Sequence, residues 1–172
     1  MTKSKGLCNH QFPTEAEKIK PIIMPYLKDK AVIYDVGCGR QKIVPHAFGI
    51  DIAKNSHIDI HLPDRNAVYE LTKYVDKRGD VVFSSHFLEH VNYWEQALFS
   101  MIRILKTGGI LVLYLPDDNY YDNDSNPQHL HRFTYEQFSN YMLFVATNLE
   151  LIESGFHTGI GLYSFYWIGY KK

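Results

Sequence analysis

Short apolar runs alternate with amphipathic stretches along this chain, and that alternation restricts the fold more than any other feature of the sequence. We expect buried strands over residues 31–36, 47–51, 57–62, 80–84 and 110–115, and two further strands over 149–154 and 161–169. Apolar residues at helical spacing predict helices over 66–75, 92–106 and 134–142. A helix over 14–29 contains Pro21 and Pro25, so we expect it to be broken or kinked there.

Strands that alternate with helices and then end in a hairpin indicate an open α/β sheet with helices on both faces. The 172 residues fit one domain. We expect residues 1–30 to form an N-terminal helical segment and residues 31–172 to form a Rossmann-like core. With 45% hydrophobic and 22% charged residues the chain is typical of globular proteins. Its net charge of -1 gives no basic surface, so nucleic acid is not the expected partner.

The sequence also bears on where the protein is found. The first residues lack the apolar stretch of a signal peptide, and no apolar run approaches the roughly 20 residues that span a membrane. Its two cysteines, Cys8 and Cys38, do not form the pattern of a disulfide framework. We therefore expect a cytoplasmic protein, as a monomer or a homodimer.

Polar side chains follow four of the expected strands at the points where these strands end. They are Asp35, Asp51, the serines and histidine at 84–86, and Asp117 with Asp118. In open parallel sheets, ligands bind outside the carboxyl ends of the strands, where the strand order reverses. The pattern predicts one shared cleft at this edge of the sheet.

The turn after the first expected strand reads Asp35-Val-Gly37-Cys-Gly39. Glycine allows a sharp turn and a close approach of backbone to ligand, and Cys38 is a small residue suited to such a tight turn. A dinucleotide site would have a third glycine opening a helix, but Arg40 and its neighbours follow instead. The acid at position 35 suits a cationic amino group better than a diphosphate, and Asp51 is placed to accept hydrogen bonds from ribose hydroxyls.

Four motifs, at 32–39, 48–51, 80–91 and 102–109, resemble in sequence and order those of class I S-adenosylmethionine-dependent methyltransferases. The resemblance runs from about residue 31 to about 138. It implies a sheet of about seven strands, mostly parallel with an antiparallel C-terminal strand, and S-adenosylmethionine as methyl donor. The link from Gly39 to the second strand is short, which resembles a compact variant of the family.

The resemblance also implies roles for individual residues in binding S-adenosylmethionine. Gly37, Cys38 and Gly39 would line its methionine part, Asp35 would anchor that part, and Asp51 would hold the ribose. Ile52 would pack on the adenine, while Ser84, Ser85 and His86 would close over the cofactor. Either Asp59 or Asp64 would meet the adenine amino group.

Histidines gather in two segments that we expect at the same cleft. His86, Glu89 and His90 are spaced i, i+3 and i+4, and His129 and His131 lie in the loop after the fifth expected strand. One interpretation is structural, with these side chains tying the two segments together. A second makes His86, His131 or His90 a catalytic residue, since neutral imidazole can remove a proton near pH 7.

A third interpretation is a divalent metal site made of Glu89, His90 and either His131 or His129, because imidazole and carboxylate are suitable ligands for Zn, Mn or Fe. This spacing is similar to that of small-RNA 2'-O-methyltransferases, although His86 stands where those enzymes have an acid.

The expected function is the transfer of a methyl group from S-adenosylmethionine to a small-molecule or glycan acceptor, at oxygen. Methylation of RNA or another nucleic acid, with or without a metal, is the alternative. A binding module without turnover would share the same cofactor motifs.

Overall fold

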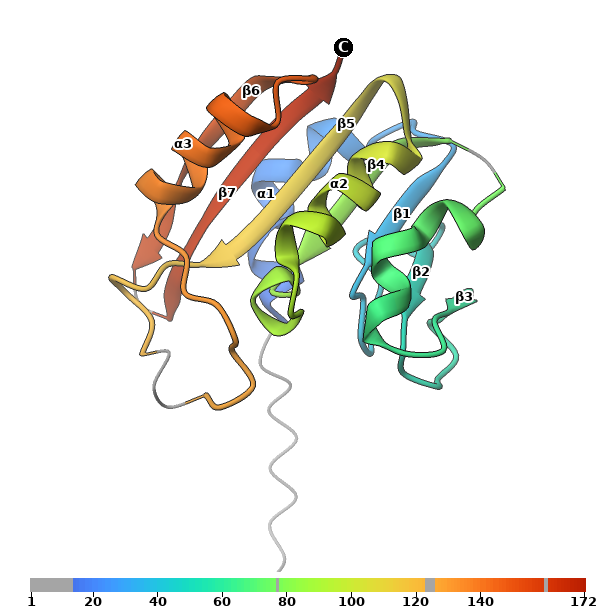
Figure 1. Cartoon of the computed structure of the whole chain (residues 1–172), viewed down its shortest axis with the longest axis horizontal. Helices are drawn as coiled ribbons and strands as arrows, with labels where there is room; N and C mark the ends of the chain where they lie inside the picture. Colours follow the sequence, from blue (N-terminus) through green and yellow to red (C-terminus); the bar gives the residue numbers. More distant parts are fainter. Residues whose placement is uncertain (1–13, 77, 123–125, 160) are drawn as a thin grey trace, which may run out of the picture.

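The structure is a computed structural model that describes residues 14–76, 78–122, 126–159 and 161–172. Its seven strands form one sheet with the order β3-β2-β1-β4-β5-β7-β6 (Figure 1). They are β1 (Ile33–Val36), β2 (Phe48–Asp51), β3 (Ile60–His61), β4 (Gly79–Ser85), β5 (Leu105–Pro116), β6 (Leu149–Gly159) and β7 (Leu162–Lys171). The first five are parallel, and β7 runs antiparallel between β5 and β6. The predicted mostly parallel α/β sheet with a reversed C-terminal strand is confirmed.

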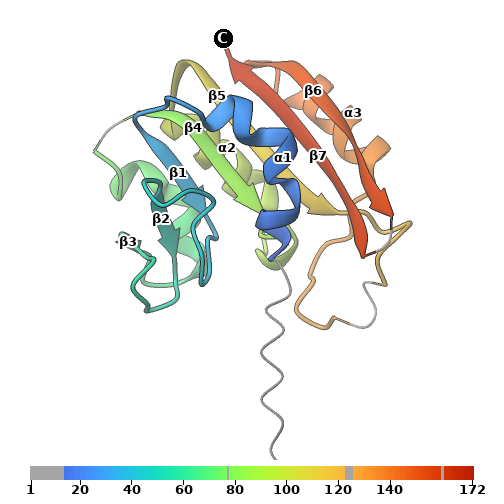
Figure 2. The ribbon, with the colours of Figure 1, turned by 180° about the vertical axis from the view of Figure 1, so that it is seen from behind.

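Helices cover both faces of the sheet, as predicted. The helix α1 (Glu15–Leu27) lies on one face (Figure 2), and the elements η1 (Arg65–Lys73), α2 (Trp94–Ile104) and α3 (Tyr135–Val145) lie on the other. Side chains alternate between the two cores because successive residues of a strand point to opposite faces. In β4, for example, Val81 and Phe83 pack in the core under α1, whereas Val82 packs in the core under α2.

Of the two outcomes expected for α1, a break or a kink at its prolines, the structure has no break. Glu15–Leu27 is a single α-helix with Pro21 and Pro25 inside it. Figure 2 shows the ribbon of α1 changing direction partway along its length. Each proline removes one backbone N–H from the helix, which is a common cause of such a bend. Three apolar residues on one face, Ile19, Ile23 and Leu27, are buried against the sheet and hold it in place.

Several boundaries differ from the predicted ones. The stretch expected as a helix over 66–75 is a 3-10 helix with non-helical backbone at Glu70. The helix α2 ends at Ile104, before the expected end at residue 106, because Leu105 is extended and pairs with Gly79. The terminal hairpin is longer than expected, with β6 reaching Gly159.

The short link between β1 and β2 contains no helix, in agreement with the sequence. Its residues Ile43 and Val44 are buried in the core under α1. Within the described ranges, no helix is both long enough and apolar enough to cross a bilayer.

Candidate active site

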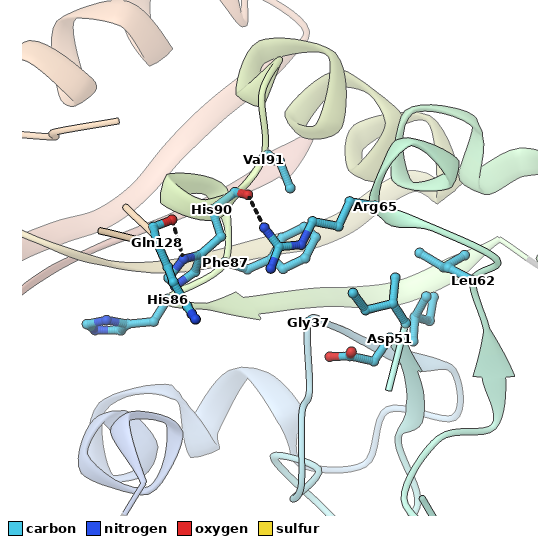
Figure 3. A pocket seen from close by; sticks show the side chains of 11 residues that line it. Gly37, Asp51, Leu62, Arg65, His86, Phe87, His90, Val91 and Gln128 are labelled. Carbon is cyan, nitrogen blue, oxygen red and sulfur yellow. Dashed lines mark hydrogen bonds between the residues drawn. The ribbon is translucent and has the colours of Figure 1, made fainter. Parts of the chain in front are cut away.

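Two hollows open at the carboxyl ends of the central strands, and Gly37 lines both of them. The first, of about 190 Å³, is lined by Gly37, Ile50, Asp51, Ile52, Leu62, Arg65, His86, Phe87, His90, Val91 and Gln128 (Figure 3). The second, of about 130 Å³, is lined by Thr14, Glu15, Ala16, Asp35, Gly37, Cys38, Arg40, Gln41, Phe83 and Ser85. Both hollows open at the edge of the sheet where one shared cleft was expected, and Gly37 of the glycine turn lies between them.

The turn itself depends on glycine at two positions. Gly37 and Gly39 have φ of 79° and 58°, which L-residues with a side chain rarely adopt. A Cβ at Gly37 would lie 2.4 Å from Cδ2 of Phe87, so the ring of Phe87 packs directly on the turn. Gly39 lines neither hollow, and its amide instead donates to Oδ2 of Asp51 at 2.9 Å. The turn is therefore held by the acid that ends the second strand.

Asp35 is almost fully buried beside the second hollow. Its Oδ2 accepts a hydrogen bond from the amide of Ile43 at 2.6 Å. Burial raises the pKa of the Asp35 carboxyl to about 7, although the Ile43 hydrogen bond and Lys42 oppose the shift. A carboxyl with such a pKa gains from the approach of a cation, because a positive charge nearby would offset the cost of burying its charged form.

Asp51 and Ile52 form one wall of the first hollow. The two carboxylate oxygens of Asp51 accept hydrogen bonds from the amides of Gly39 and Ala53, at 2.9 and 2.8 Å. Each oxygen keeps a second lone pair for a ligand donor. Ile52 is 39% exposed, an apolar side chain presented at the hollow.

The remaining predicted cofactor residues divide between the cleft and the sheet. Cys38 and Ser85 line the second hollow, and burial raises the pKa of the Cys38 thiol to about 12, so it stays protonated at neutral pH. Ser84 lies outside both hollows. Its hydroxyl is buried and donates to the carbonyl of Val36 at 2.9 Å, which ties β4 to β1.

The two candidates for the adenine contact lie away from both hollows. Asp59 accepts from Nζ of Lys42 at 3.0 Å and from the amide of Gly49 at 2.8 Å, and these contacts lower its pKa although burial opposes them. Asp64 caps η1 by accepting from the amides of Asn66 and Ala67. Between them in the sequence, Leu62 is the side chain that does line the first hollow.

His86 follows β4 with φ of 49°, an unusual value for a residue with a side chain. Its Nε2 lies 3.0 Å from the hydroxyl of Ser164, and its ring contacts Tyr114 and Tyr163 edge-on. Burial lowers the pKa of His86 to about 3, with smaller effects from His129, Lys18 and His90, so the imidazole is neutral at pH 7. In Figure 3 its ring points away from Asp51, toward the opposite end of the hollow.

The segment after His86 carries the acid and the second histidine of the predicted cluster. The short helix η2 (Leu88–His90) buries Glu89 completely, and burial raises the pKa of its carboxyl to about 8. Nδ1 of His90 lies 3.0 Å from the carbonyl of Gln128, and Figure 3 shows both residues at the first hollow. The loop that contains His129 therefore meets η2, as the sequence predicted.

His131, by contrast, does not reach either hollow. Its Nε2 lies 2.8 Å from the carbonyl of Val91 and 3.2 Å from that of Asn92, and its side chain borders a separate hollow beside Trp94. The expectation that His131 lies at the cleft is wrong, because its imidazole is held by the backbone that follows η2. Asp117, also expected at the cleft, instead accepts from the amides of Asn119 and Tyr135.

Several residues that line the hollows were not identified from the sequence. Arg65 and Phe87 belong to the first hollow, and Thr14 and Glu15 to the second. Phe87 follows His86 directly and Arg65 follows the third strand closely, so their positions at strand ends were the available clue. Thr14 and Glu15 reach the cleft because α1 begins beside the glycine turn, which is a tertiary contact.

A family model described as a methyltransferase domain matches residues 9–154. A comparison with curated protein sequences finds no match. Among solved structures, the fold is similar to 1,6-didemethyltoxoflavin-N1-methyltransferase of Burkholderia thailandensis, with bound 1,6-didemethyltoxoflavin and S-adenosylhomocysteine. That alignment has a TM-score of 0.67 and 16% identity, and it covers 92% of this chain and 78% of that one.

Two further solved structures share the fold. The N-methyltransferase NodS of Bradyrhizobium japonicum, in complex with S-adenosylhomocysteine, has a TM-score of 0.67 at 14% identity, over 94% of this chain and 89% of that one. An S-adenosylmethionine-dependent methyltransferase of Methanosarcina mazei has a TM-score of 0.63 at 18% identity, over 88% of this chain and 97% of that one. Together with the matched domain model, the sheet order and the glycine turn, they show that the chain belongs to the methyltransferase domain family and is a class I S-adenosylmethionine-dependent methyltransferase.

Proposed function

We propose that this protein transfers the methyl group of S-adenosylmethionine to an oxygen atom of a small-molecule or glycan acceptor. The observation that carries the proposal is the pair of hollows that meet at Gly37. The walls of the two hollows differ in chemistry, and this difference matches the one between the nucleoside half and the methionine half of S-adenosylmethionine. The first presents apolar side chains and an acid, and the second presents a buried acid with small polar groups.

The nucleoside half of the donor fits the first hollow. Ile52 and Leu62 offer apolar surface for a base, and Asp51 offers carboxylate oxygens for ribose hydroxyls. The methionine half fits the second hollow, where Asp35 can pair with the cationic amino group beside Cys38 and Ser85. Gly37 lines both hollows, so the sulfonium that joins the two halves would lie beside it. Gly39 would act indirectly, by holding Asp51.

The end of the first hollow that His86 and His90 occupy is then where the acceptor would bind. A hydroxyl must lose its proton as it attacks the methyl group, whereas a neutral amine can attack through its lone pair. Two imidazoles at this position favour oxygen, and they are the candidate proton acceptors. A small acceptor fits because the chain has a net charge of -1 and the hollow is modest in volume.

The test is methyl transfer from S-adenosylmethionine with a labelled methyl group, offered to hydroxylated small molecules and sugars, to amines, and to RNA. Label on a hydroxyl compound supports the proposal, and the product's linkage identifies the atom. Transfer to amines alone would overturn the assignment to oxygen, and transfer to RNA alone would overturn the acceptor class. Calorimetry with S-adenosylhomocysteine and with NAD checks the donor site separately, since only the former should bind.

A further inference from the structure

Glu89 is a completely buried carboxyl group that lies close to the imidazoles of His86 and His90. Neither of its oxygens has a hydrogen-bond partner among the described residues. Two imidazole nitrogens face its Oε1, Nδ1 of His86 at 3.5 Å and Nε2 of His90 at 3.9 Å. A buried acid without a partner is costly, so native proteins normally pair it with a donor or a cation.

Three groups that can bind a metal converge at this place. One oxygen of Glu89, one nitrogen of His90 and one nitrogen of His129 all lie within 4.8 Å of one another. In tetrahedral coordination, ligand atoms about 2.0–2.2 Å from a common ion are about 3.3–3.6 Å apart. Binding an ion would therefore need these side chains to draw together by about 1 Å.

The backbone around the cluster holds both histidines in place. The carbonyl of Glu89 accepts from the amide of Leu130 at 2.7 Å, and the carbonyl of Gln128 lies 3.0 Å from Nδ1 of His90. These two contacts flank His129 on the loop and fix it against η2. Because a proton on Nδ1 of His90 satisfies that carbonyl, Nε2 keeps the lone pair that a metal requires. Metal-binding histidines are typically oriented by such a bond.

We propose that Glu89, His90 and His129 bind a divalent first-row transition-metal ion. Two imidazoles and one carboxylate suit Zn, Mn or Fe, and three protein ligands leave further coordination positions open. His90 and Gln128 also line the first hollow, so the ion borders the place where the acceptor would bind. There it could coordinate an acceptor hydroxyl and lower its pKa, a role that rests on the proposed function. His86 then remains the candidate proton acceptor.

The structure selects His129 over His131 for this site. The two differ by two positions in the sequence, but Nε2 of His131 is engaged by the carbonyls of Val91 and Asn92. Replacing His129 or His131 by alanine therefore provides a matched test of which residues bind the metal, because each change removes one imidazole from the same loop.

The experiment is calorimetric titration of chelator-treated, full-length protein with Zn²⁺, Mn²⁺ and Co²⁺, without donor or acceptor. We expect one ion per chain for at least one of the metals. Glu89→Gln and His129→Ala should each weaken binding by on the order of 100-fold or more, at or above the roughly 10- to 100-fold that loss of an orienting residue costs. His131→Ala should leave the affinity within about twofold of wild type. Absorption of bound Co²⁺ reports nitrogen and oxygen coordination independently.

Lack of saturable binding by the wild type would overturn the site, and would mean that Glu89 is protonated or shared with His86. Equal losses in His129→Ala and His131→Ala would overturn the choice of ligands. His129 lies on a partly exposed loop, so its variant keeps the test valid if Glu89→Gln fails to fold. Binding of S-adenosylhomocysteine to metal-free protein is measured in parallel. The two measurements therefore distinguish loss of the proposed metal site from loss of the proposed S-adenosylmethionine site.

Discussion

Replacing Gly37 by alanine tests the packing of the glycine turn, and Gly39→Ala is its matched control. Both glycines have positive φ, 79° and 58°, and a non-glycine residue there costs about 1–2 kcal/mol. The new Cβ at Gly39 would meet no atom within 4 Å. The one at Gly37 would lie 2.4 Å from Cδ2 and 2.8 Å from Cβ of Phe87, so rotating the ring cannot remove the clash.

Overpacking of this kind costs about 1–3 kcal/mol in addition to backbone strain. We therefore expect Gly39→Ala to lower the free energy of unfolding by about 1–2 kcal/mol and Gly37→Ala by about 2–5 kcal/mol. Urea denaturation measures both, and for a chain of this size each kcal/mol also shifts Tm by about 2–4 °C. The double variant Gly37→Ala, Phe87→Ala should lose less stability than the sum of the two single changes.

Cofactor affinity gives a second readout of the same pair of variants. Gly37 lines both hollows and Gly39 lines neither, so Gly37→Ala should weaken binding of S-adenosylhomocysteine far more than Gly39→Ala does. Calorimetry on the folded variants measures this. Equal stability losses for both alanines, with additive behaviour of Phe87→Ala, would refute the role given to the Phe87 contact.

Three further substitutions test other contacts. Asp51→Ala should weaken binding of S-adenosylhomocysteine by about 1–3 kcal/mol, the scale of hydrogen bonds to a charged group, and an unchanged calorimetric affinity would exclude its contact with ribose. Because the pKa of Asp35 is raised to about 7, its contribution to stability is present at low pH and lost as pH rises through 7. If the ionised form pairs with the donor, affinity for S-adenosylmethionine should rise from pH 5.5 to 7.5 in wild type and stay flatter in Asp35→Asn. His131→Ala should lower the free energy of unfolding by about 1–2 kcal/mol, since it leaves backbone carbonyls without a hydrogen-bond donor. It should not change the affinity for S-adenosylhomocysteine. Loss of turnover at unchanged stability would instead indicate a catalytic role for His131.

Features that depend on neighbours in the sequence were predictable here. The apolar runs and the glycines between them predicted the parallel strands, and the turn with Asp51 predicted where a ligand would bind. The structure brings Asp35, Gly37, Cys38, Asp51 and Ile52 to the two hollows. These residues sit at strand ends, where the position in the sequence fixes the position in the sheet.

Features that depend on tertiary contact were not predictable. The hairpin was expected too short because β6 is an edge strand with mostly exposed side chains, so its apolar pattern is weak. The roles of His129 and His131 could not be separated in the sequence, since each side chain is directed by a tertiary contact: the ring of His129 packs on His90, and Nε2 of His131 meets the carbonyl of Val91. Asp117 looks like a cleft residue in the sequence, but its partners are amides of a turn and of α3.

The start of α1 forms part of the wall of the second hollow, and this has a consequence for exchange of the cofactor. Glu15 accepts from the hydroxyl of Tyr163 at 2.9 Å, and Lys18 donates to the carbonyl of Gly161 at 3.0 Å, so two contacts to the last strand and its turn fasten the first helical turn. Fraying of that turn would open the hollow without disturbing the sheet. Bound cofactor would oppose the fraying, so its residence time and the hydrogen-exchange protection of the first amides of α1 should rise and fall together.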